Sequence, residues 1–439
     1  MDLTVGVVPQ GSIYDEVLYE MLDHQGVAYR VIDVRQATER YPVVLLSKYF
    51  EDSHSLALES CAAESDVIVA ERVVPLDKML SMLGGAVADP RDNFELTVNR
   101  EEDRLLSTIR EHLFRLSLPL VRKWYWPRGA NACCVLTHDI DWFKYSPFHL
   151  QVLKQSANPL RLLRLAFDSL ARKKDYGWNI PETVKLEQEC GFKSTFFFQT
   201  SYGRDDPMLE RSADFLNKEG FELALHGAQT SYNDADSLRE EMQRFRSRTG
   251  IDTRGLRYHI LKFDPPHTWE LQSAAGLEYD ATFYYNRFFG FRSGICFPYR
   301  PFSKESRLPI LELPTGYMDW TSLHRGQSAR EQLETLEATR KAVEGYHGIL
   351  VANFHNTYLN HETFPGVYAA FSALLKSAKK ERYWVATAQE CANWWRLRAS
   401  ARINPRLESG DVVCSPTSLS TVVEREGSES QLIAPAQSP

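Results

Sequence analysis

The stretch CCVLTHDID at residues 133–141 decides how this chain is interpreted. Its first part is a short apolar run typical of a buried strand, and it ends on Asp139 and Asp141, two residues apart. Side chains at i and i+2 of a strand share one face, so both carboxylates should project together from the strand's C-terminal end. Barrel enzymes hold their catalytic groups at that end. Two carboxylates this close repel each other unless a cation or a shared proton relieves them, which makes a metal site the simplest interpretation.

The composition is that of a folded globular protein without a nucleic-acid partner. A hydrophobic fraction of 43% and a charged fraction of 25% are ordinary for such a protein, and 439 residues suffice for two or three domains. The net charge of -7 and the lack of a basic run argue against nucleic acid. The start lacks the features of a signal peptide, and no stretch approaches the roughly twenty apolar residues of a membrane helix. With seven cysteines, an odd number without CxxC spacing, we expect a cytoplasmic protein with reduced thiols.

Strand and helix signals divide the chain into four parts. Residues 1–92 alternate strands and helices, which predicts a small open α/β accessory domain of the Rossmann or flavodoxin type. Residues 93–129 are predicted as a linker helix and a boundary. From 130 to 400 apolar strands recur between helices, as in a barrel-like parallel α/β fold, with an insertion at 144–178 that carries a basic helix. Residues 401–439 are rich in Ser, Glu and Pro, and we expect a disordered tail.

Further polar residues stand at the ends of the predicted barrel strands. His226 ends one apolar run, Arg257 and His259 end the next at i and i+2, and His355 follows a third. Arg292 lies in a glycine-flanked loop and is a candidate for binding an anion. A single such histidine is usually structural, but several polar residues ending successive strands are hard to explain as packing, because buried polar groups need partners.

In this order, the segments 137–141, 194–197 and 225–226, with Arg257 and His355, resemble the motifs of the polysaccharide deacetylase family. These are carbohydrate esterases similar to the nodulation deacetylases. The resemblance covers roughly residues 125–398 and is strongest to a bacterial branch with a His-Asp-x-Asp first motif and an N-terminal α/β extension. It implies a distorted (β/α)7 barrel.

The resemblance also implies a role for each matching residue. In similar proteins the first Asp of the first motif is the catalytic base and the second binds the metal, which would be Asp139 and Asp141. The histidine of the second motif, here His226, would be a second ligand. Arg257 would orient the base, and His355 would protonate the leaving group.

Two positions depart from the family pattern. The family has a second histidine four residues after the first, where this chain has Thr230, and the residues after Arg257 also differ. Since a structure of this kind needs three protein ligands and a water around zinc, Asp141 and His226 alone would leave the metal under-coordinated. His259 either supplies the missing nitrogen or hydrogen-bonds Asp139 or the substrate, and the sequence leaves both interpretations open.

The leading functional hypothesis is a metal-dependent hydrolase, with zinc as the expected cofactor, that removes N-acetyl groups from amino sugars of a polysaccharide or its precursor. Its partner would be a carbohydrate, with Trp142, Tyr232, Trp320 and Arg292 lining the cleft. A glycan-binding pseudoenzyme without a complete metal site is an alternative that Thr230 favours. A C–N hydrolase acting on a non-sugar cyclic amide is another, which a small closed pocket would favour.

Overall fold

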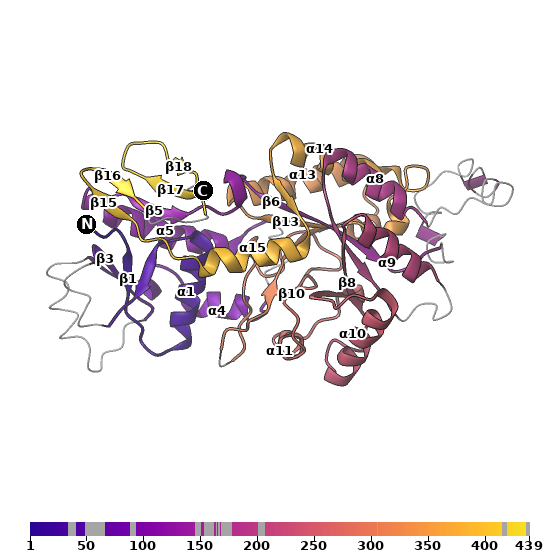
Figure 1. Cartoon of the computed structure of the whole chain (residues 1–439), viewed down its shortest axis with the longest axis horizontal. Coiled ribbons are helices and arrows are strands. Elements are labelled where there is room, and N and C mark those ends of the chain that lie inside the picture. Colours follow the sequence, from indigo (N-terminus) through magenta and orange to yellow (C-terminus); the bar gives the residue numbers. More distant parts are fainter. Residues whose placement is uncertain are drawn as a thin grey trace.

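The computed structural model contains, in its described part, two parallel sheets, which helix α5 (Thr97–Arg115) connects along the chain, and two small antiparallel sheets (Figure 1). It describes residues 1–33, 41–48, 66–87, 94–144, 151–152, 162–163, 165, 167, 178–200, 207–304, 306–414 and 419–435. The predicted insertion at 144–178 and its basic helix lie largely outside the described residues. None of the helices in the described part is both long and apolar enough to cross a membrane.

The N-terminal residues form a four-stranded parallel sheet, as the alternating signals predict. Its strand order is β2-β1-β3-β4, so the chain winds first to one side of β1 and then to the other, as in an open doubly wound sheet. Helix α1 begins after a turn at Gly11, and its residues Val17, Leu18, Met21 and Leu22 are buried against the sheet. The elements are β1 (Val5–Val7), α1 (Ile13–Gln25), β2 (Tyr29–Val31), β3 (Val43–Leu46), β4 (Asp66–Val69), α4 (Leu76–Leu83) and α5 (Thr97–Arg115).

The larger sheet carries the predicted strand-end residues. Its strand order is β11-β10-β9-β8-β7-β6-β13-β12, and every neighbouring pair is parallel. The first half of β6 also pairs with β14. The strands are β6 (Cys133–Ile140), β7 (Thr195–Phe198), β8 (Glu222–Gly227), β9 (Gly255–Tyr258), β10 (Tyr279–Asp280), β11 (Leu311–Glu312), β12 (Thr315–Met318), β13 (Ile349–Asn353) and β14 (Trp384–Ala386).

This sheet must curl, because its two ends are joined by a very short piece of chain. Strands β11 and β12 lie at opposite ends of the order, yet only residues 313–314 separate them. A connection of two residues spans roughly 10 Å at most, and the two edges of the sheet therefore have to approach each other. The predicted distorted α/β barrel is therefore confirmed.

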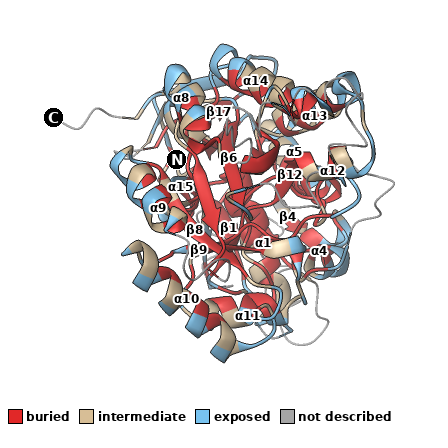
Figure 2. Cartoon of the chain, turned by 90° about the vertical axis from the view of Figure 1, so that its right-hand side faces the viewer, coloured by how far each residue is buried: buried red, intermediate tan, exposed pale blue. Residues whose placement is uncertain are grey.

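Helices surround the curled sheet, and its strands are buried (Figure 2). Because the strands are parallel, all their C-terminal ends meet at one rim, where a site can assemble. The helices are α8 (Ile180–Cys190), α9 (Met208–Lys218), α10 (Ala235–Thr249), α11 (His267–Ala274), α12 (Asp319–His324), α13 (Ala329–Gly345), α14 (Pro365–Lys380) and α15 (Ala388–Ser400).

The expectation of a disordered C-terminal tail is wrong for the described residues beyond 401. Strand β17 (Thr421–Glu424) is fully buried and pairs with β5 (Leu120–Lys123), which directly follows the linker helix. Glu424 accepts hydrogen bonds from Arg110 of that helix and Arg122 of β5. A short β-branched run that ends on a glutamate with two arginine partners is enough to order a segment whose average composition is polar. The other strands are β15 (Arg406–Glu408), β16 (Asp411–Val413) and β18 (Gln431–Ile433).

Candidate active site and metal centre

Five of the predicted residues meet at the rim of the curled sheet. Asp139 lies near the end of β6 and Asp141 directly follows that strand. His226 lies in β8, His259 directly follows β9, and His355 lies two residues beyond β13. All five line a cavity of about 280 Å³, together with Trp142, Tyr258, Ile260, Leu261, Asn286, Met318, Trp320 and Tyr358.

The Asp139 carboxylate is buried and held at both oxygens. Arg257 donates from Nη1 to Oδ1 at 2.9 Å, and Asn353 donates from Nδ2 to Oδ2 at 2.7 Å. Burial alone would raise the pKa of Asp139, but the charges of Arg257, His226 and His355 together outweigh burial and lower it. Arg257 is itself fixed by donation to the Thr137 hydroxyl and the Ala281 carbonyl. Asp139 is therefore an oriented, ionised carboxylate facing the cavity.

His226 turns a buried nitrogen toward Asp141. Its Nδ1 lies 2.8 Å from the Arg257 carbonyl oxygen, which requires a proton on Nδ1. In the neutral ring Nε2 is then an unprotonated acceptor, and it faces Asp141 Oδ1 at 2.9 Å without a hydrogen-bond donor. Two acceptors in such contact repel each other unless a cation or a second proton lies between them. Burial lowers the pKa of His226, but the neighbouring Asp139 and Asp141 carboxylates outweigh burial and raise it.

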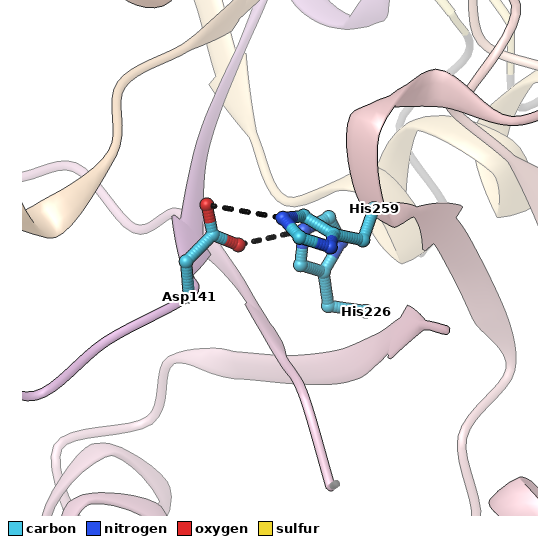
Figure 3. A group of neighbouring side chains, drawn as sticks. All are labelled: Asp141, His226 and His259. Carbon is cyan, nitrogen blue, oxygen red and sulfur yellow. Dashed lines mark ion pairs between the residues drawn. The ribbon is translucent and has the colours of Figure 1, made fainter. Parts of the chain in front are cut away.

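His259 brings a second imidazole to the same carboxylate (Figure 3). Its Nε2 lies 3.8 Å from Asp141 Oδ2, and the candidate ligand atoms of Asp141, His226 and His259 all lie within 4.8 Å of one another. A central point therefore lies within about 3 Å of all three atoms, and an inward movement of up to about 1 Å would give the roughly 2 Å bonds of a tetrahedral zinc ion. Burial lowers the pKa of His259, so a second imidazolium is disfavoured here.

The three donors suit zinc in number and in type. Two imidazoles and one carboxylate, with a fourth position open to the cavity, form the usual set of a catalytic zinc site. Thr230, which stands where the family has its second histidine, is exposed and is not among the residues that line the cavity. The donor atoms lie close enough together for His259 to serve as the third ligand of one ion.

His355 faces the cavity with its ring fixed from behind by Asp319. The ring Nδ1 lies 2.6 Å from Asp319 Oδ1, and the His355 backbone N–H donates to Asp319 Oδ2 at 2.8 Å. The free Nε2 lies 3.9 Å from Asp139 Oδ2 and 3.8 Å from Asp141 Oδ2. Burial lowers the pKa of His355, but the carboxylates of Asp319, Asp141 and Asp139 together outweigh burial and raise it to about 9, with Asp319 contributing most. His355 is therefore protonated at neutral pH and can supply a proton.

The sequence interpretation missed Asp319 and Asn353. Asp319 begins α12 directly after β12, so it too follows a strand end. Asn353 is the last residue of β13, two positions before His355 and on the same face. The strand-end rule that selected His355 would also have selected both residues if it had been applied to every polar type.

Aromatic side chains form the walls of the cavity, as predicted for Trp142 and Trp320. Trp142 is 38% exposed, and its backbone carbonyl accepts a hydrogen bond from Asn356. The Trp320 ring stacks on Tyr358 with 6.3 Å between centroids. Flat apolar faces beside a polar floor suit the faces of a sugar ring.

The predicted substrate contacts of Arg292 and Tyr232 are not supported, because neither residue is among those lining the cavity. The Arg292 guanidinium instead lies over the Phe283 ring, 4.2 Å from its centroid, and donates to the Tyr284 carbonyl. Tyr232 packs against the hydrophobic core. A glycine-flanked loop does not by itself show which way its arginine turns.

A strained turn follows His259. Ile260 and Leu261 have φ of 52° and 55°, the left-handed region that β-branched residues strongly disfavour. The Ile260 carbonyl accepts a hydrogen bond from Asn286 Nδ2 at 2.7 Å, which helps to hold the turn. Strain of this kind persists where the surrounding structure enforces it, commonly at functional sites.

Comparison with known proteins finds similarity only among solved structures. No protein-family model and no curated protein matches the chain. A Mycobacterium smegmatis protein assigned as a polysaccharide deacetylase is 20% identical, with 65% of this chain and 98% of that chain covered and a TM-score of 0.45. A similarly assigned protein from Pseudomonas aeruginosa PAO1 is 17% identical, with coverages of 62% and 93% and a TM-score of 0.45.

The chain resembles polysaccharide deacetylases in fold. The matched structures also include a CE4 family pseudoenzyme from Bacillus anthracis. That protein is 11% identical, with 60% of this chain and 66% of that chain covered and a TM-score of 0.33. At such identities the likeness concerns the fold, and the chemistry has to be argued from this chain's own residues.

We expect the protein stripped of metal to bind one zinc ion, with an affinity that depends on His259. His259→Ala should weaken binding by at least about 100-fold, because the change removes a ligand. Thr230→Ala is the matched control and should stay within about twofold of the parent. Isothermal titration calorimetry measures both affinities, and a His259→Ala variant that binds zinc like the parent would exclude His259 as a ligand.

Relief of the turn after His259 should stabilise the metal-free protein. Asn tolerates φ > 0 far better than Ile, so Ile260→Asn should raise the free energy of unfolding by about 1 kcal/mol in a denaturant titration. Leu397→Asn, at an exposed position within α15, is the control and should not stabilise. A lower stability for Ile260→Asn would show that the turn is not strained.

Proposed function

We propose that this protein is a divalent-metal hydrolase that removes N-acetyl groups from amino sugars of a polysaccharide or its precursor. The observation that carries the proposal is the arrangement around one cavity of an ionised, oriented carboxylate, a three-donor cation cluster and a protonated histidine. These are Asp139, the cluster Asp141, His226 and His259, and His355. Together they provide a base, a Lewis-acid position and an acid, which amide hydrolysis requires.

Asp141, His226 and His259 would hold the metal, with zinc as the ion that best suits the donors. A bound divalent ion would acidify a water molecule and polarise the acyl carbonyl. His226 is oriented for this task, because the bond from its Nδ1 to the Arg257 carbonyl fixes which nitrogen faces the cavity.

Asp139 accepts the proton of the attacking water. Its Oδ2 points to the centre of the site, 3.9 Å from both His226 Nε2 and His355 Nε2. The donors Arg257 and Asn353 fix the carboxylate plane, so the remaining lone pairs have one orientation. The Arg257 charge also helps to keep the group ionised, which is the form a base needs.

His355 gives a proton to the departing nitrogen. Water oxygen adds to the acyl carbon, the C–N bond breaks, and the amine leaves only when its nitrogen is protonated. The products are acetate and a free amino sugar. His355 Nε2 and Asp139 Oδ2 face the cavity together, so one amide could contact both.

A carbohydrate is the substrate class that fits the cavity walls. Trp142, Trp320 and Tyr358 offer aromatic faces beside the polar floor, and Trp142 is partly exposed at the rim. Sugar rings present apolar faces with hydroxyl edges, which such walls accommodate.

The direct test is acetate release from a panel of N-acetylated sugars by the zinc-loaded protein. Asp139→Asn should lower the turnover number by at least about 100-fold, because an amide cannot take a proton from water. Thr230→Ala serves as the control and should keep parental turnover. Equal rates for Asp139→Asn and the parent would show that Asp139 is not the base.

The pH profile should depend on Asp319. A general acid works only while protonated, and the raised pKa of His355 extends that range to about pH 9. Asp319→Asn removes the largest of the three carboxylate contributions that raise the pKa of His355 against burial, so the alkaline limb of kcat/KM should move to lower pH by at least about one unit. Initial rates across the neutral and alkaline range test this, and an unchanged alkaline limb would contradict the assignment of His355 as the acid.

A further inference from the structure

His138 lies within the strand-end motif but faces away from the cavity. Its neighbour Asp139 points into the site, and successive residues of a strand point to opposite faces. The His138 ring is fully buried between the Phe196 and Phe371 rings, with centroids 4.6 and 5.7 Å away. A titratable ring in such surroundings needs hydrogen-bond partners on both nitrogens.

Both nitrogens of His138 face oxygen acceptors. Nδ1 lies 2.9 Å from the Phe354 carbonyl oxygen, and Nε2 lies 2.9 Å from Glu187 Oε1. The other Glu187 oxygen accepts a hydrogen bond from the Ser194 hydroxyl at 2.7 Å. A carbonyl oxygen can only accept, so Nδ1 carries a proton and donates to Phe354. Glu187 and Ser194 hold the far side of the ring in place.

The Phe354 carbonyl is the first one beyond the β6–β13 ladder. The strands pair as far as Asn353 and Thr137, and the Phe354 N–H still donates to the Thr137 carbonyl. The next peptide group joins Phe354 to His355 and has left the ladder. The His138 side chain takes over the role of the missing strand bond, so it fixes the peptide that carries His355.

We propose that His138, clamped by Glu187, is a positioning residue for His355, a role that rests on the proposed function. Asp319 orients the imidazole ring of His355 and holds its N–H, while His138 holds the preceding carbonyl. With both contacts the His355 backbone has one position relative to Asp139. Without the His138 contact, the acid would lose its alignment with the leaving nitrogen, and misplacement of about 1 Å can cost about 100-fold in rate.

Two polar substitutions separate this role from a general loss of packing. In His138→Asn the side-chain amide can take the place of Nδ1 and donate to Phe354, but it is too short to reach Glu187. In His138→Gln the amide takes the place of Nε2 and meets Glu187, but it leaves the Phe354 carbonyl without a donor. Both variants remove the same ring from the same core, so their stabilities should fall alike.

The readout is the ratio of turnover on an N-acetyl amide to turnover on an activated acetyl ester, measured with the zinc-loaded full chain. An activated ester needs no proton on its leaving group, so only the amide reports the acid. His355→Ala defines the ratio without an acid. We expect His138→Gln to lower the ratio by at least about tenfold and His138→Asn to stay within about threefold of the parent.

Each outcome decides a different point. Equal losses on both substrates in His138→Gln, with a shifted ratio in His355→Ala, would overturn the positioning role and leave the proposed function intact. A ratio that does not shift in His355→Ala would refute the acid and, with it, the role of His138. A parent inactive on both substrates would contradict the proposed function itself.

Discussion

The site depends on one electrostatic constraint, which is that a ring nitrogen of His226 and one of His259 both face the carboxylate of Asp141. His226 cannot donate from Nε2 without becoming charged, because its other nitrogen already donates to a backbone carbonyl. If both His226 and His259 were protonated, two cations would stand with ring centroids 5.4 Å apart. One divalent ion satisfies all three groups together, and this makes the cluster a candidate metal centre.

The direction of the strands brings these three side chains together. Parallel strands place every carboxyl end at one rim, and the short β11–β12 connection forces that rim to curl around a common centre. Two of the three carboxylates at this rim have a cationic side chain as partner, and the third is left to bind a metal ion. Asp139 is balanced by Arg257, Asp319 is balanced by His355, and Asp141 remains for the cation. The arrangement separates base, acid and metal ligand within a cavity of about 280 Å³.

Most of the site could be predicted because the ends of buried strands can be recognised in a sequence. An apolar run that ends on Asp139, His226 or His355 predicts both a buried strand and a polar group at its end. The direction of a side chain in a loop cannot be recognised in this way. Arg292 was therefore predicted to bind an anion, although its guanidinium lies over the Phe283 ring. The C-terminal strands were missed because β17 is held by a partner, β5, about 300 residues away in the chain.

X-ray absorption spectroscopy of the zinc-loaded protein tests the central claim most directly. The outer-shell scattering of imidazole rings reports how many histidines bind the ion. Two imidazoles with one carboxylate oxygen in the shell would agree with coordination by Asp141, His226 and His259. A shell with a single imidazole, or with none, would contradict it.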